Sequence, residues 1–242
     1  MLLAIDIGNT NINCGIFTGK MLTRRFGIPT EGYSIQRLKK LLGRADIDDS
    51  IICSVVPAKT GLFKRDLNKL FNKKPLILGR EVKIPIKNLY RNPKQVGSDR
   101  LVNAYAGIKL YGTPLIVVDF GTAITFDVIS KKKEYLGGLI LPGLEISLAA
   151  LAQKTALLPR IRLGRPKELI GRDTKDSMLS GIIYGFACLV DDLTNRIKVK
   201  IGNKAKIIGT GGNIQLIRKY CKSIDKIDRD LTLKGLNLVY NT

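Results

Sequence analysis

The chain contains an internal repeat, and this repeat restricts the possible folds more than any other feature. Residues 3–17 (LAIDIGNTNINCGIF) align without gaps on residues 116–130 (IVVDFGTAITFDVIS), 113 positions later. Each copy reads as an apolar strand, a D-x-G turn and a second β-rich strand, which is the pattern of a hairpin. The sequence therefore predicts two similar halves. The aligned pairs include Asp6 with Asp119, Gly8 with Gly121, Asn9-Thr10 with Thr122-Ala123, and Ile16 with Ile129.

Strands and helices alternate along the rest of the chain. We expect further strands at 51–56, 75–78, 134–141 and 205–211, and helices at 34–42, 60–71, 98–112 and 174–197. This order predicts an α/β protein whose two halves, residues 1–112 and 113–242, face a cleft.

The composition is that of a globular protein. Hydrophobic residues make up 45% of the 242 residues, which is enough to build a sizeable core. No uninterrupted apolar run approaches the ~18 residues of a membrane span, and no basic leader precedes the first apolar residues. We therefore expect a soluble, cytoplasmic protein that does not enter a membrane.

The absence of histidine excludes several kinds of chemistry. With no histidine in the chain, acid–base catalysis must use a carboxylate, lysine, tyrosine or cysteine. The four cysteines are scattered and form no C-x-x-C pair, which argues against a zinc site or a redox motif.

The net charge of +21 could attract nucleic acid or small anionic substrates. However, the lysines are spread along the chain rather than gathered into one stripe with aromatic residues between them. We interpret them as a solvated surface and expect no nucleic-acid partner.

The two D-x-G turns are the first candidate site. A carboxylate at a strand end, followed by glycine, lets main-chain amides approach an anion while the acid holds a cation. One such turn is also common in ordinary hairpins. Two turns in equivalent positions of a duplicated fold favour a site for a polyphosphate and its metal.

A second candidate is GSDR, residues 97–100. The sequence could simply be a helix N-cap with an acidic first turn. Alternatively, Asp99 is a base that accepts a hydroxyl proton and Arg100 meets an anionic group. The glycine-rich segments GGLILPG (137–143) and TGGN (210–213) are turns or nucleotide contacts. Neither a Walker motif nor G-x-G-x-x-G occurs.

Taken in order, the motifs resemble those of type III pantothenate kinases, members of the actin-like, acetate and sugar kinase superfamily. The resemblance covers essentially the whole chain. It rests on DIGNT (6–10), SVVP (54–57), GSDR (97–100), DFGTA (119–123), GGLILPG (137–143), GRDTKDSMLSG (171–181) and TGG (210–212).

The resemblance implies a duplicated ribonuclease-H-like fold around a nucleotide cleft. It implies transfer of the γ-phosphate of ATP to the terminal hydroxyl of pantothenate, the first step of coenzyme A biosynthesis. It also implies Mg²⁺ with ATP, a monovalent cation (K⁺ or NH₄⁺), and a homodimer in which the neighbouring subunit completes the substrate site.

The family roles pass to the matching residues of this chain. Asp99 matches the catalytic base, Asp6 the residue that serves magnesium, and Asp119 the ligand of the monovalent cation. The ATP contacts would be Asp6, Ile7, Gly8, Asn9, Thr10, Asn11, Ile12, Asn13 and Thr122. The pantothenate contacts would be Tyr90, Gly97, Ser98, Asp99, Arg100 and, from the neighbouring subunit, Thr174.

Other classes of protein share some of these features. An accessory transcription regulator of the same family could use the positive charge to bind DNA. A phosphatase or ATPase of the superfamily would keep both D-x-G turns without needing GSDR and Tyr90. A structural protein would have no use for polar side chains gathered at strand ends.

Overall fold

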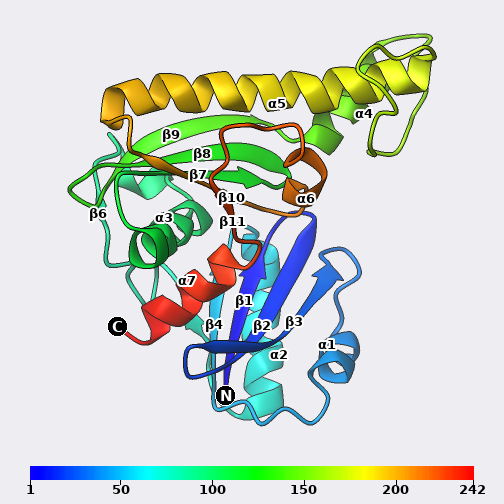
Figure 1. Cartoon of the computed structure of the whole chain (residues 1–242). Coiled ribbons are helices and arrows are strands. Elements are labelled where there is room, and N and C mark those ends of the chain that lie inside the picture. Colours follow the sequence, from blue (N-terminus) through cyan, green and yellow to red (C-terminus); the bar gives the residue numbers. More distant parts are fainter. The chain divides into compact units, whose positions relative to one another are not determined.

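The computed structural model describes residues 1–242, and the chain forms two compact units. Unit 1 comprises Met1–Lys87, Arg91–Lys109 and Asp230–Thr242, and unit 2 comprises Asn88–Tyr90 and Leu110–Arg229. Each unit has one β-sheet with helices packed on it (Figure 1). The duplicated α/β architecture predicted from the repeat is confirmed.

Unit 1 is built on a five-stranded sheet in the order β3-β2-β1-β4-β5. The first three strands form an antiparallel meander, and β4 and β5 continue the sheet in parallel. Its strands are β1 (Leu2–Ile7), β2 (Asn11–Thr18), β3 (Met21–Pro29), β4 (Asp49–Ser54) and β5 (Leu76–Ile77). Its helices are α1 (Ile35–Leu42), α2 (Pro57–Phe71), the short η1 (Pro93–Gln95), α3 (Ser98–Tyr111, of which residues 98–109 belong to this unit) and α7 (Leu231–Tyr240).

Side chains of β1 alternate between two hydrophobic cores. Leu3, Ile5 and Ile7 pack in a core that includes residues of α1 and α2. Leu2 and Ala4 face the opposite way, into a core completed by residues of α3 and α7. Because the side-chain period of a strand is two, Asp6 continues the row of Leu2 and Ala4. The last polar residue of β1 therefore lies on the α3 side of the sheet.

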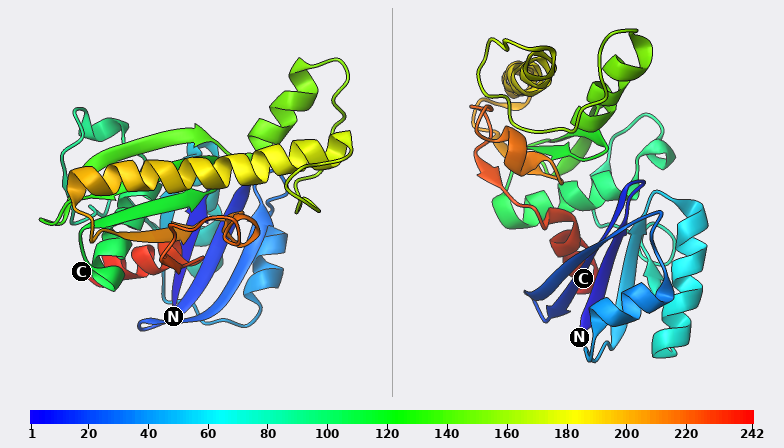
Figure 2. Two further views of the ribbon diagram at one scale, coloured as in Figure 1. Left: turned by 45° about the horizontal axis from the view of Figure 1, so that its top comes forward. Right: turned by 90° about the vertical axis from the view of Figure 1, so that its right-hand side faces the viewer.

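Unit 2 is built on a six-stranded sheet in the order β11-β10-β7-β8-β9-β6. One face carries a core of Ile116, Val118 and Phe120 with apolar residues of three helices. The longest of these helices, α5, runs along this sheet (Figures 1 and 2). The strands are β6 (Lys87–Asn88), β7 (Leu115–Phe120), β8 (Ala123–Ile129), β9 (Glu134–Pro142), β10 (Lys206–Thr210) and β11 (Lys226–Ile227). The helices are α4 (Leu144–Lys154), α5 (Thr174–Ile201) and α6 (Ile214–Ile217).

Helix α5 is long and apolar enough to cross a membrane when judged by length and composition alone. Its residues Met178, Ile183 and Val190 are buried in the core of unit 2. The apolar character of α5 is therefore explained by packing against a sheet, as in the core helix of an α/β unit.

The repeat is realised with one difference. β7 follows β1 at the 113-residue offset along its whole length. Asp6 pairs with Asn13, however, whereas Asp119 pairs with Thr125, so the second hairpin is one residue shorter. The gapless alignment is therefore wrong beyond the turn. Ile16, which pairs with Leu3, corresponds to Val128, which pairs with Ile116, and not to Ile129.

The two units do not coincide with the expected division at 112/113. Asn88–Tyr90 belongs to unit 2, and Asp230–Thr242 belongs to unit 1. The C-terminal segment belongs to unit 1 because of its packing: Leu233, Leu236 and Val239 of α7 are buried in the same core as Leu2 and Ala4. Hydrophobic burial, rather than order in the sequence, assigns α7 to unit 1.

This packing predicts that α7 is essential for the stability of unit 1. We expect Leu236→Ala to destabilise the protein by about 2–5 kcal/mol, because Leu236 is fully buried and its truncation leaves a cavity. Val199→Ala, at an exposed position of α5, should change stability by less than about 0.5 kcal/mol. Urea unfolding followed by circular dichroism provides the measurement, and equal effects of the two substitutions would contradict the assignment.

Candidate functional site

Asp6 lies at the carboxyl end of β1, between two neighbouring strands. It pairs with Asn13 of β2 on one side and with Cys53 of β4 on the other. The Asn13 side chain hydrogen-bonds the Asp6 carboxylate. Cys53 is fully buried, and burial followed by the charges of Asp6 and Asp99 raises the pKa of its thiol. The strand pairing thus places the Asp6 carboxylate beside a protonated thiol and an amide.

The turn after β1 is held by main-chain hydrogen bonds. Gly8 N–H donates to Asn11 O at 3.0 Å, and a Cβ at position 8 would lie 3.0 Å from the same oxygen. Thr30, just after β3, donates its hydroxyl to Gly8 O at 2.8 Å and its N–H to Thr10 O at 2.9 Å. Thr30 is buried and was not identified from the sequence. It anchors the turn from the third strand.

The predicted ATP contacts in this turn fall into two groups. Asn9, Thr10 and Asn11 are exposed to solvent. Ile7 and Ile12 are fully buried in the core with α1 and α2. The side chains of these two isoleucines therefore cannot touch a nucleotide, and a contact from either residue is limited to its main chain.

The GSDR segment forms the start of α3. Ser98 Oγ lies 3.4 Å from Cys53 Sγ, which ties the helix start to β4. A Cβ at position 97 would overlap Asp99 Oδ1, so Gly97 makes room for the carboxylate. Arg100 N–H donates to Asp99 Oδ1 at 2.8 Å, and the Arg100 side chain is largely buried. Local geometry therefore fixes Asp99 at the first turn of the helix.

Asp6 and Asp99 are electrostatically coupled within unit 1. Burial, and then the negative charge of Asp99, raises the pKa of Asp6 to about 7. Burial also raises the pKa of Asp99, against the opposing effects of the Arg100 N–H and guanidinium. Two carboxylates held together in a partly buried place favour a cation between or beside them.

The SVVP segment has a structural role beside this site. Ser54 Oγ accepts the Val56 N–H at 3.1 Å and the Thr60 hydroxyl at 2.7 Å. Pro57 is the first residue of α2. The segment therefore joins the end of β4, next to Cys53, to the start of a helix.

Asp119 occupies the corresponding strand end in unit 2. Gly211 has φ +93°, and a Cβ there would overlap Asp119 Oδ1 and lie 2.6 Å from the main chain of Phe120. Gly143 N–H donates to Thr122 O at 3.1 Å. The structure thus brings the DFGTA turn together with the glycines of GGLILPG and TGG. Thr122 itself is exposed.

Tyr90 is placed on unit 2, whereas Gly97–Arg100 belong to unit 1. The family resemblance groups these residues as predicted pantothenate contacts. Chain folding distributes them between the two units, and within unit 2 the Tyr90 ring lies against Gly137.

Thr174 is the first residue of α5 and is exposed. The preceding loop is fastened to the helix. Ser177 Oγ donates to Gly171 O at 3.1 Å, Ser180 Oγ donates to Leu169 O, and Asp173 Oδ1 accepts the Asp176 N–H at 2.7 Å. A Cβ at Gly171 would overlap Ser177 N, so only glycine allows this close approach. The GRDTKDSMLSG motif therefore presents Thr174 on a rigid turn.

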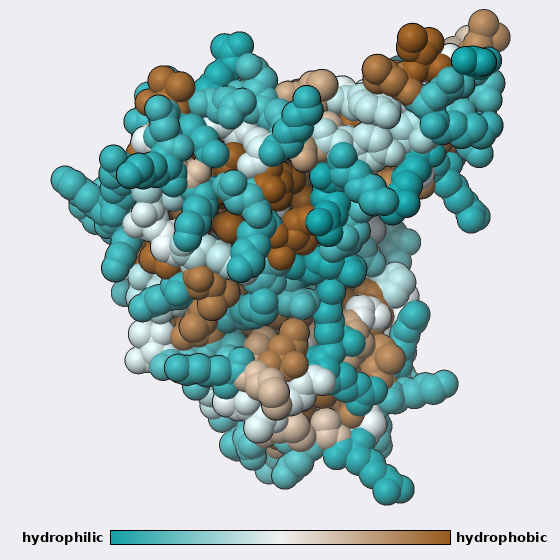
Figure 3. All heavy atoms as spheres, viewed as in Figure 1, coloured by the Kyte–Doolittle hydropathy of each residue, from teal (hydrophilic) through white to brown (hydrophobic).

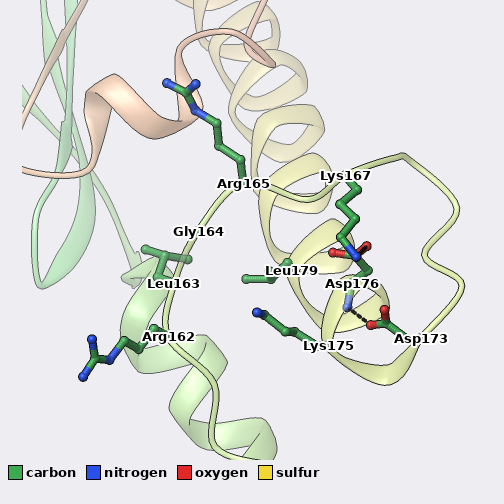
Figure 4. A pocket seen from close by; sticks show the side chains of 9 residues that line it. All are labelled: Arg162, Leu163, Gly164, Arg165, Lys167, Asp173, Lys175, Asp176 and Leu179. Carbon is green, nitrogen blue, oxygen red and sulfur yellow. Dashed lines mark hydrogen bonds and ion pairs between the residues drawn. The ribbon is translucent and has the colours of Figure 1, made fainter.

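A cavity of about 310 Å³ lies beside Thr174, between the loop and α5 (Figure 4). The Lys175 ammonium points into it, whereas the Arg162 and Arg165 guanidinium groups extend away from its centre. Lys167 pairs with Asp176 at 3.6 Å on one wall. The cavity adjoins the predicted substrate contact but contains none of the residues around Asp6.

The side chains alone do not enclose a metal ion. No group of three or more His, Cys, Asp or Glu side chains is arranged to hold one. Asp6 and Asp119 each offer carboxylate oxygens next to a turn, which are suitable donors for Mg²⁺ and for a monovalent cation if a ligand or water completes the shell.

Comparison with known proteins shows which family the sequence matches. The family model described as "Type III pantothenate kinase" matches residues 2–196. A type III pantothenate kinase of Geobacter sulfurreducens is 44% identical, and one of Halalkalibacterium halodurans is 42% identical. Each alignment covers 99% of this chain and 98% of the relative.

Solved structures support the fold. A Campylobacter jejuni protein assigned to the Baf family of transcriptional activators has a TM-score of 0.64 at 22% identity, covering 99% of this chain and 97% of the other. The activator of 2-hydroxyisocaproyl-CoA dehydratase from Clostridium difficile, solved with bound ADPNP, has a TM-score of 0.57 at 12% identity, with 99% and 93% covered. At these identities the likeness concerns the fold alone.

The electrostatics of Asp6 predict a pH-dependent stability in the absence of divalent metal. The folded state keeps the Asp6 proton up to about pH 7, whereas the free carboxyl has a pKa of 3.8. Asp6 therefore costs the folded state stability as pH rises from about 4 to 7. We expect Asp6→Asn to be more stable than the wild type by ~1–4 kcal/mol at pH 8, with little difference at pH 4.

Urea unfolding in EDTA across this pH range provides the measurement, and Asp46→Asn, at an exposed position outside the site, is the control. A difference between Asp6→Asn and wild type that is independent of pH would contradict the coupling.

Proposed function

The chain belongs to the type III pantothenate kinase family, and from this membership we propose how its residues divide the work of the reaction. The protein is a kinase that phosphorylates pantothenate with ATP in coenzyme A biosynthesis. The observation that carries the proposal for its site is the coupling of Asp6 and Asp99. The GSDR segment puts a carboxylate at a helix start, beside the strand end that carries DIGNT.

Asp99 is the catalytic base in this proposal. Phosphoryl transfer requires mainly positioning and charge stabilisation, so the base has only to orient the hydroxyl and accept its proton late. The raised pKa of Asp99 makes its carboxylate a better proton acceptor than an exposed aspartate. Gly97 and the Ser98–Cys53 contact hold it in place.

Asp6 and the turn Gly8–Asn13 form the proposed ATP and magnesium site. The donor set fits a hard cation. Asp6 is a partly buried carboxylate that the negative charge of Asp99 repels, and a bound cation would reduce this repulsion. When bound with ATP, Mg²⁺ supplies positive charge to the phosphate oxygens. The side chains of Asn9, Thr10 and Asn11 and the main chain of the turn orient the phosphates.

Asp119 is the proposed ligand of K⁺ or NH₄⁺, and Thr122 a further ATP contact. Gly121 and Gly211 approach the Asp119 carboxylate closely, since a Cβ at either position would lie 3.4 Å or less from Asp119 Oδ1, and carboxylate oxygen is a suitable ligand for such a cation. The proposal for this cation comes from the family, and the carboxylate with nearby main-chain oxygens is chemically suited to it.

Tyr90, Gly97, Ser98 and Arg100 are the proposed pantothenate contacts, together with Asp99. Arg100 could pair with the substrate carboxylate, for which a guanidinium is well shaped.

A homodimer is proposed, with Thr174 completing the site of the neighbouring subunit. Leu157, Leu169 and Ile170 are 91%, 61% and 79% exposed, which is unusual for three large apolar side chains of one loop. Apolar side chains are visible over this loop, residues 155–173, at the upper right of Figure 3. Burial of this loop against a second copy would explain both the apolar side chains and the rigid presentation of Thr174.

The regulator alternative is not favoured. The curated relatives with 40–44% identity over nearly the whole chain are pantothenate kinases. The Baf family protein shares only the fold at 22% identity. We propose a cytoplasmic enzyme that does not bind nucleic acid, which a salt titration with duplex DNA would check.

The direct test of this function is phosphate transfer from ATP to pantothenate, measured with K⁺ and again with K⁺ replaced by Na⁺. We expect product only when pantothenate is present, and a strong loss of rate in Na⁺. ATP hydrolysis that does not depend on pantothenate would favour an ATPase instead. Equal rates in both salts would remove the proposed role of the monovalent cation.

Replacement of the base gives a sharper prediction. We expect Asp99→Asn to lower kcat by about 10²–10⁴-fold, because the amide cannot accept the hydroxyl proton. The fold should persist, since the amide occupies the same space. Asp46→Asn serves as the control for loss of one surface charge. Near-normal turnover of Asp99→Asn would exclude Asp99 as the base.

Mixing of inactive variants tests the shared site. If Thr174 acts on the neighbouring subunit, a dimer of one Asp99→Asn chain and one Thr174→Ala chain contains one intact site. We therefore expect activity to rise when the two variants are unfolded and refolded together, toward a quarter of wild type for random assembly at equal amounts. No recovery in verified mixed dimers would show that Thr174 acts within its own subunit or not at all.

A further inference from the structure

Tyr90 lies on a three-residue segment that belongs to a different unit from the residues on either side of it in the sequence. Asn88–Tyr90 belongs to unit 2, although the residues before and after it belong to unit 1. Leu89 N–H donates to Tyr135 O at 2.9 Å, which attaches the segment to the edge of β9. Tyr90 N–H donates to Asn88 Oδ1 at 2.9 Å. The main chain on the N-terminal side of the Tyr90 Cα is therefore held to unit 2.

The strand that receives this segment is itself anchored. The Tyr135 side chain is fully buried, and its hydroxyl donates to Asp127 Oδ1 of β8 at 2.8 Å. Asp127 is also fully buried. The carbonyl that accepts the Leu89 N–H thus belongs to a residue with little freedom to move.

A β-bulge follows directly in β9. Ile129 pairs with Tyr135 and Val128 with Gly137, so Leu136 is an extra residue in β9. Gly137 has φ +124°, a conformation that only glycine adopts without strain. Bulges commonly redirect side chains or strands next to active sites. Here the bulge lies beneath the Tyr90 ring.

Gly137 and the Tyr90 ring are in close contact. A Cβ at position 137 would lie 3.3 Å from Tyr90 Cδ2 and 3.4 Å from Cε2, closer than most methyl–ring contacts. The ring therefore covers the one residue in the bulge that has no side chain. Glycine is required here twice, for the backbone conformation and for the approach of the ring.

We propose that Gly137 is a positioning residue for pantothenate binding, which acts by seating the Tyr90 ring on the β9 bulge. The inference rests on the proposed function, in which Tyr90 contacts pantothenate. Gly137 does not touch the substrate in this scheme. Gly137 determines how closely the aromatic ring approaches β9, while Tyr135 and Asn88 hold the backbone of the segment that carries the ring.

The test is Gly137→Ala, with Gly19→Ala as the matched control. Gly19 also has positive φ (+58°) but nothing within 4 Å of an added Cβ, so its substitution adds backbone strain without displacing a ring. We expect Gly137→Ala to raise the KM for pantothenate about tenfold, because a small displacement of a positioned group is costly. The KM for ATP should stay within about twofold. Gly19→Ala should leave both KM values unchanged.

A double-mutant cycle separates positioning from general structural damage. If Gly137 acts through Tyr90, adding Gly137→Ala to Tyr90→Ala should not raise the pantothenate KM further. Effects that multiply in the double variant would overturn the proposal, as would an equal rise in the KM for ATP.

The same double-mutant cycle, measured by thermal unfolding, tests the contact between Gly137 and the Tyr90 ring independently of enzyme activity. The Tm shifts of Gly137→Ala and Tyr90→Ala should be non-additive, and additive shifts would contradict the contact. If the wild-type protein does not phosphorylate pantothenate, the proposed function fails and the substrate role of Gly137 fails with it. A non-additive Tm cycle would then support the ring contact alone, whereas loss of the KM effect in an active enzyme would refute only the positioning role.

Discussion

The alternation of side chains along β1 determines the chemistry of the first unit. Because Leu3, Ile5 and Ile7 must enter the core beneath α1 and α2, Asp6 must face α3. The start of α3 then brings Asp99 into the same region, and two carboxylates share a partly buried place. The cost of holding these charges together is what makes the region suitable for cations and phosphate, so the hydrophobic pattern and the proposed catalytic site have one origin.

Much of the fold could be predicted from the sequence, since apolar periodicity and the repeat are local signals. β3, α4 and α7 were not predicted. β3 is an edge strand with exposed charged residues, and α4 follows directly after the glycine- and proline-containing end of β9. α7 contains Gly235, where a Cβ would lie 2.8 Å from Val102, so its glycine reflects close helix packing that no local pattern reveals.

The candidate site residues could be named from the sequence where they are adjacent along the chain, as in GSDR and the two D-x-G turns, and their roles stay predictions. Thr30 and Cys53 escaped notice because their contacts span the sheet, from β3 to the first turn and from β4 to α3. The family motif also grouped Ile7 and Ile12 with the ATP contacts, although their buried side chains belong to the core. A motif records which residues recur together and does not distinguish those that bind from those that support.

The position of α7 has a consequence for biosynthesis. The core of unit 1 needs Leu233, Leu236 and Val239, which are synthesised only after all of unit 2. A nascent chain therefore lacks the α7 part of this core while the second unit is made, and α3 alone packs on that face of the first sheet. Synthesis of unit 2 is complete before that of unit 1, because the last segment of unit 1 follows it in the sequence. During that interval the apolar side chains that α7 later covers, among them Leu2, Ala4 and Ile51, are less completely buried, and such exposure favours aggregation.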